Sequence, residues 1–113
     1  MSIHNFRNEQ RESFLHTVKT EAATLSKAEL DGGSVIINDA SGIAITLPVA
    51  ATHYAGAYCL IANKGAGAST VTVAAGFGGA GSGTDTITLA QGDMASVLCD
   101  GNNWYSLHHT TGG

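Results

Sequence analysis

At 113 residues the chain has the length of a single domain, and no run approaches the ~18 apolar residues that a membrane-spanning helix requires. Charged residues make up 12% of the chain and hydrophobic residues 43%, enough to form a core, so global disorder is not expected. The net charge of −4 arises within residues 31–113, where Lys64 accompanies five aspartates. Such a surface neutralises few phosphates, so nucleic-acid binding is not expected.

Residues 1–15 predict an N-terminal arm, because polar and mixed-charge residues surround a few isolated apolar ones. A weak helix over residues 8–19 is the alternative, since Phe14, Leu15 and Val18 would share one face. We favour an arm that becomes ordered on a neighbouring subunit. Because this stretch also lacks the apolar segment of a secretory signal, we expect the protein to stay in the cytoplasm unless it leaves within a larger assembly.

Residues 16–113 form the predicted β domain, which begins with three short strands. These strands are expected at residues 17–22, 34–38 and 43–47. Pro48 ends the third strand because it has no amide proton to donate. Between the first two strands, residues 25–30 predict one helical turn, with Ser26 as its N-cap and Glu29 at the capping-box position.

The second half of the chain continues the pattern of short strands separated by turns. Strands are expected at residues 57–62, 69–74, 84–90, 93–99 and 103–108. The strand at 57–62 is apolar at every position, which favours a central strand buried on both faces.

Eight strands without intervening helices predict an all-β fold, a single antiparallel β-sandwich or small barrel. No parallel sheet with crossover helices is expected. The core should contain the large apolar residues of these strands, namely Val35, Ile37, Ile45, Leu47, Leu60, Val71, Val73, Ile87, Leu89, Val97 and Leu98.

The residues that could carry chemistry do not form a catalytic or metal-binding pattern. His108 and His109 are adjacent, so on a strand they point to opposite faces and do not converge on one ion. The glycine-rich run 76–83 lacks the Gly-Lys-Ser/Thr ending of a phosphate loop and precedes a strand pattern rather than a helix. Most aspartates of the body lie in turn signals, where Asp commonly bonds its own backbone. We therefore expect no enzyme activity, no metal and no cofactor.

Three aromatic residues and two cysteines leave alternatives open. Tyr54, Trp104 and Tyr105 could form a glycan-binding platform of a small hydrolase, although such residues more often belong to a core or an interface. Cys59 and Cys99 could pair, but both lie in apolar strand patterns, which favours free, buried thiols.

Several segments resemble a β module of tailed-bacteriophage virion proteins, among them small head decoration (cement) proteins. The segments are LSKAELDGGSVIIN at residues 25–38, IAITLP at 43–48 and GAYCLIAN at 56–63. The ending LCDGNNWY at residues 98–105 is similar to the Asp-Gly-x-x-Trp close of such modules, which also occurs in tail fibres and spikes. Together these segments extend the resemblance over roughly residues 24–107.

The resemblance implies a capsid decoration subunit on the head exterior of the virion, assembled in the host cytoplasm. It implies a homotrimer bound to the major capsid protein at local three-fold positions. A tail-fibre or receptor-binding module is the alternative. We favour the head because the chain carries one module, has an arm suited to gripping a neighbour, and lacks repeats and heptads.

The predicted partner contacts are apolar, aromatic and basic residues of the arm together with two aromatic residues of the body. They are Ile3, Phe6, Arg7, Arg11, Phe14, Phe77 and Trp104. Trp104 follows an Asp-Gly-Asn turn that fixes its register, so we expect it to anchor the body, either in its own core or at a subunit interface.

Overall fold

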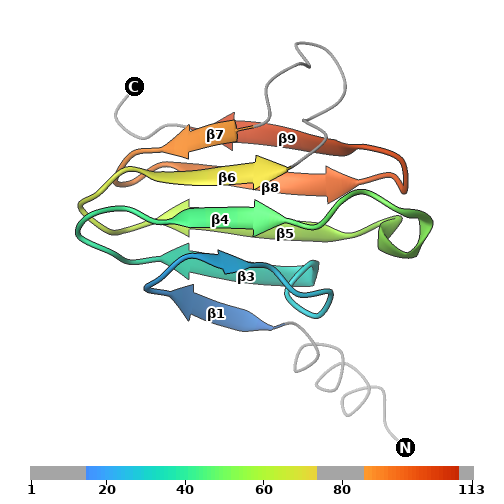
Figure 1. Cartoon of the computed structure of the whole chain (residues 1–113), viewed down its shortest axis with the longest axis horizontal. Helices are drawn as coiled ribbons and strands as arrows, with labels where there is room; N and C mark the ends of the chain where they lie inside the picture. The colour runs from blue at the N-terminus through green and yellow to red at the C-terminus, as the bar shows by residue number, and fades with distance from the viewer. Residues whose placement is uncertain (1–14, 74–85, 110–113) are drawn as a thin grey trace, which may run out of the picture.

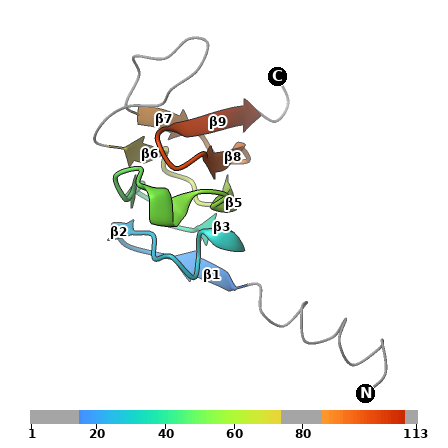
Figure 2. The same cartoon turned by 90° about the vertical axis from the view of Figure 1, so that its right-hand side faces the viewer.

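The computed structural model describes residues 15–73 and 86–109, which fold into two mixed β-sheets (Figure 1). The five-stranded sheet contains, in spatial order, β1 (His16–Lys19), β3 (Asp31–Ile37), β5 (Tyr58–Asn63), β8 (Met94–Cys99) and β9 (Trp104–His109). The four-stranded sheet contains β2 (Ala23–Thr24), β4 (Ala44–Leu47), β6 (Ser69–Val73) and β7 (Thr86–Leu89). Figure 2 shows the sheets as two facing layers, so the all-β prediction is confirmed and the barrel alternative is not.

The first six strands alternate between the sheets, so each sheet is parallel over its first three strands. In one sheet, His16 of β1 aligns with Ser34 of β3, which aligns with Leu60 of β5. In the other, β2, β4 and β6 follow the same parallel order. The prediction of an antiparallel fold is therefore wrong for β1 to β6. Two parallel neighbours in one sheet are connected through a strand of the opposite sheet rather than through a helix. Antiparallel pairing begins with β7, β8 and β9.

The two sheets enclose one core. Every predicted core residue is buried except Leu60 and Leu98, which point away from it with exposed fractions of 39% and 46%. Side chains alternate between the two faces of a strand, which explains both errors. The inward positions of β5 and β8 are occupied by the residues next to Leu60 and Leu98 in the sequence. The core also contains Leu25, Leu30, Ile61 and Ala95, which were not predicted to lie in it, together with Cys59, Cys99 and Trp104.

The predicted helical turn is present between β2 and β3. The amide of Ser26 donates to Glu29 Oε1 at 2.9 Å, and the amide of Glu29 donates to Ser26 Oγ at 3.2 Å, which is the predicted capping box. The amide of Leu30 donates to the carbonyl oxygen of Ser26 at 3.0 Å and closes the turn. The turn thereby buries Leu25 and Leu30 at the edge of the core.

A short 3-10 helix that the sequence did not predict, η1 (Thr52–Tyr54), follows Pro48. In the described parts of the chain, no helix is long and apolar enough to span a membrane.

Candidate functional site

The strongest candidate site is the side of the five-stranded sheet that points away from the core, here called the outer face. It carries six large apolar side chains with exposed fractions between 36% and 72%. They are Val18 on β1, Tyr58 and Leu60 on β5, Met94 and Leu98 on β8, and Leu107 on β9.

Strand register joins these side chains into one patch. Across β5, β8 and β9, Tyr58 aligns with Leu98 and Leu98 with Tyr105, while the next row aligns Leu60 with Ser96 and Ser96 with Leu107. The two rows enclose adjoining shallow hollows of about 230 and 250 Å³. Five strands about 4.8 Å apart and about six residues long cover on the order of 500 Å². This area includes polar positions such as Ser34 and Ser96, and the apolar part of it falls within the range of the largest patches on monomers, which are often functional.

Among the described residues, the centre of the outer face carries no Asp, Glu, Lys or Arg. Its outward positions hold apolar residues together with Ser and Tyr, and on β1 His16 Nδ1 lies 2.7 Å from Ser34 Oγ. Acids flank the sheet at both ends, since Asp31 begins β3 and Asp100 follows β8 at one end, and the buried Asp93 precedes β8 at the other. An apolar, charge-poor centre with polar groups at its margin is typical of protein interfaces.

The opposite surface of the molecule contrasts with this patch. Apart from Ala44, the outward positions of the four-stranded sheet are threonines, namely Thr24, Thr46, Thr70, Thr72, Thr86 and Thr88. Two of their hydroxyl oxygens, Thr72 Oγ1 and Thr86 Oγ1, lie 3.2 Å apart. Threonine suits a sheet face in water because it keeps β propensity while offering a hydroxyl. The chain therefore builds one solvent-adapted sheet face and one apolar face.

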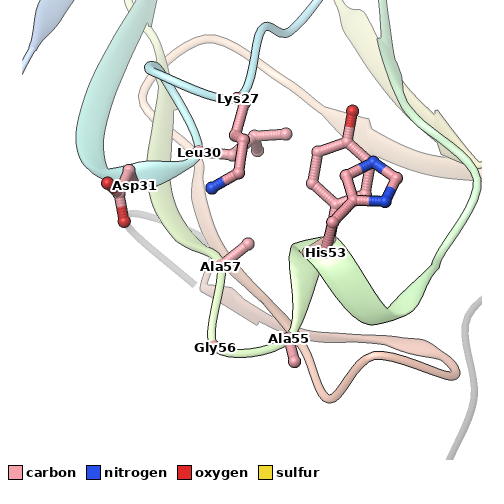
Figure 3. Close-up of a pocket in the computed structure, with 8 residues that line it drawn as sticks. Lys27, Leu30, Asp31, His53, Ala55, Gly56 and Ala57 are labelled. Carbon is pink, nitrogen blue, oxygen red and sulfur yellow. The ribbon is translucent and has the colours of Figure 1, made fainter.

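A small polar cavity lies at the end of the molecule where β3 and β5 begin (Figure 3). Lys27, Asp31, His53 and Tyr54 contribute to its lining, and these residue types can take part in acid–base chemistry. Its volume is about 50 Å³, far below the 300–1,000 Å³ of typical small-molecule sites. The cavity has room for water rather than for a substrate.

Glu29 is a buried carboxylate, 5% exposed, that forms an ion pair. Its Oε2 lies 2.8 Å from the Lys19 ammonium nitrogen and accepts a 2.8 Å hydrogen bond from the Thr17 hydroxyl. Burial alone would raise the pKa of Glu29, but Lys19 and the hydrogen bonds from Ser26 and Thr17 outweigh it and lower the pKa from 4.5 to about 2. This cluster fastens edge strand β1 to the helical turn, which is a structural role.

The described acids and thiols likewise have structural surroundings. Asp39, Asp93 and Asp100 each accept hydrogen bonds from backbone amides of their own turns, as predicted for turn aspartates. Cys59 and Cys99 are free and buried, also as predicted. Burial, followed by the charge of Glu29, raises the pKa of Cys59 to about 12, so its thiol is a poor nucleophile. Among the described residues, no three or more His, Cys, Asp or Glu side chains group closely enough to hold a metal ion.

Most predicted partner contacts lie outside the described residues. They are Ile3, Phe6, Arg7, Arg11, Phe14 and Phe77. Trp104 is described and fully buried. Of the two positions predicted for it, it therefore occupies the core of the body rather than a subunit interface, and it offers no surface to a partner.

The structure does not assemble the aromatic platform considered for glycan binding. The rings of Tyr54 and Trp104 have centroids 6.4 Å apart, but Trp104 points into the core and Tyr105, the next residue of β9, points to the outer face. The Tyr105 hydroxyl donates to Asp100 Oδ2 at 3.1 Å. These three side chains therefore present no common surface.

Sequence reasoning missed the outer face. Apolar residues occupy positions of both faces in β5 and β8, but the pattern at residues 57–62 predicts burial on both faces rather than an exposed apolar face. Comparisons of this chain with protein-family models, curated proteins and solved structures find no match.

Proposed function

We propose that the protein is a structural, non-enzymatic subunit that decorates the exterior of a tailed-bacteriophage head. In this role it binds the major capsid protein as a homotrimer, after assembly in the host cytoplasm. The proposal combines the resemblance of residues 24–107 to phage virion modules with one structural observation, the apolar outer face with its charge-poor centre. That observation supports an assembly subunit because a large exposed apolar patch marks an interaction surface.

In the proposed mechanism, each subunit lays its arm and one loop edge across two neighbouring shell subunits. Each contact buries little surface, but copies joined in one oligomer bind together, and multivalency raises their combined affinity. The facing β-sheets serve as a rigid β-sandwich that holds these contacts in place. Decoration then resists the outward pressure of packaged DNA.

The experiment is sedimentation of the purified protein with heads assembled without it. We expect saturable binding in a fixed ratio to the capsid subunits, and decorated heads that withstand heating better than bare ones. Heads already carrying the protein serve as the control and should take up none. If the protein fails to sediment with bare heads, the decoration proposal is wrong.

A tail-fibre or receptor-binding module is the second candidate. It is favoured by the parallel winding of β1 to β6, whose edge strands β1 and β2 could be continued by strands of another segment. Binding to isolated tails or to host cells, without binding to heads, would establish this candidate instead.

A further inference from the structure

We propose that the outer face is covered by other copies of this chain, so that the protein self-associates through its five-stranded sheet. This deepens the proposed function and rests on it for its biological role. The surface itself is defined by the geometry of β1, β3, β5, β8 and β9.

The first argument is the contrast between the two sheet faces. The same chain places mostly threonines outward on the four-stranded sheet and mostly large apolar residues (Leu, Met, Tyr and Val) outward on the five-stranded sheet. Single exposed apolar residues are ordinary, but six on one continuous face are not. The composition of the outer face is therefore typical of a surface that is buried against another protein chain.

The second argument is charge. The chain carries a net charge of −4, so identical copies repel each other at most orientations. The outer face offers an approach without Asp, Glu, Lys or Arg at the centre of either surface. Interfaces between permanent partners of the same kind are more apolar than transient ones, and their centres are depleted of charge. A second copy is the partner that this composition fits best.

The third argument is size. The patch extends to both edges of the sheet, from Val18 on β1 to Leu107 on β9, which are 54% and 72% exposed. Two such faces together contribute roughly 1,000 Å², about the minimum for a specific interface. A 113-residue domain buries a modest share of its surface alone, so it gains from covering this face.

The experiment measures the mass of the full-length protein in solution by light scattering. One variant combines Leu60→Lys with Leu107→Lys, and Leu107→Lys alone is the milder form because that side chain is already 72% exposed. The matched control is Thr88→Lys together with Thr70→Lys, which adds the same charge to the outward side of β6 and β7. Emission from the buried Trp104 verifies that each variant is folded.

We expect a multimeric wild type and control, with a mass that falls to one chain in the double outer-face variant. A wild type with the mass of one chain overturns the inference, as does a multimer that the outer-face variants leave intact. A wild-type monomer that self-associates only after removal of residues 1–13 also overturns it, because the arm would then cover the face. Binding to bare heads is measured separately. A wild type that does not self-associate but binds bare heads refutes this inference alone, whereas a wild type that self-associates but does not bind bare heads refutes the proposed function alone.

Discussion

The indole Nε1 of Trp104 donates a 2.7 Å hydrogen bond to the carbonyl oxygen of Pro48, 56 residues earlier in the chain. Trp104 begins β9 of the five-stranded sheet, whereas Pro48 follows β4 of the four-stranded sheet. The ring is fully buried, so one side chain fills the end of the core and fastens the two layers together.

Replacing Trp104 should therefore cost much of the stability of the body. Trp104→Ala removes a buried ring, which typically costs about 3–5 kcal/mol. Trp104→Phe keeps an aromatic ring but leaves the Pro48 carbonyl unpaired, which should lower the stability by about 1–3 kcal/mol. The smaller ring should lower it further. Circular dichroism during urea unfolding measures both variants. Tyr105→Phe, which removes an exposed hydroxyl of the next residue, is the control, and equal stability of all three variants would contradict the anchor role.

Stability should fall in acid because of Glu29. Its pKa is about 2 in the folded protein against an ordinary value of 4.5, so its contribution is complete above pH 4.5 and is lost as the pH falls toward 2. The full contribution is on the order of 3 kcal/mol. Unfolding by urea at several pH values from 7 to 2.5 measures it. Glu29→Gln should lower the stability at pH 7 and should flatten the dependence of stability on acid pH. The control variant, Glu21→Gln at an exposed position, should leave this pH dependence unchanged.

The tight turn after β3 requires glycine at position 42. Its φ is 86°, and a Cβ there would collide with the carbonyl oxygen of Ala68 in the next turn of the winding. Gly56 has a similar φ of 83°, but a Cβ there would meet nothing within 4 Å. Gly56→Ala should therefore cost only the backbone strain of about 1–2 kcal/mol, and Gly42→Ala about 1–3 kcal/mol more. Thermal unfolding measures the loss of stability in each variant. Equal losses would show that Gly42 does not lie against the carbonyl oxygen of Ala68.

Removing residues 1–13 should leave a folded body that no longer binds heads firmly. This arm holds few apolar positions, yet Ile3 and Phe6 need a partner surface if they are to be covered. Circular dichroism of the truncated protein should match the strand content of the full chain, and its sedimentation with bare heads should be strongly reduced. Undiminished binding would assign head recognition to the body alone.

Local chemistry was predictable from the sequence because neighbouring residues decide it. The capping box of Ser26 and Glu29, the turn aspartates and the alternation Ile43-Ala44-Ile45-Thr46-Leu47 each depend on a few adjacent positions.

The pairing of strands was not predictable in the same way. Parallel pairing of β1, β3 and β5 depends on which sheet each intervening strand joins, and no local pattern records that choice. The outer face was not predicted for a related reason. The sequence of an apolar strand such as β5 has the same pattern whether its second face packs against a core or against another chain.

Cryo-electron microscopy of the intact particle tests the central claim most directly. The account predicts density for this two-sheet domain on the outside of the head, repeated where capsid subunits meet, with outer faces of neighbouring copies turned toward one another. Particles with an undecorated head and density for this domain confined to the tail would contradict the account.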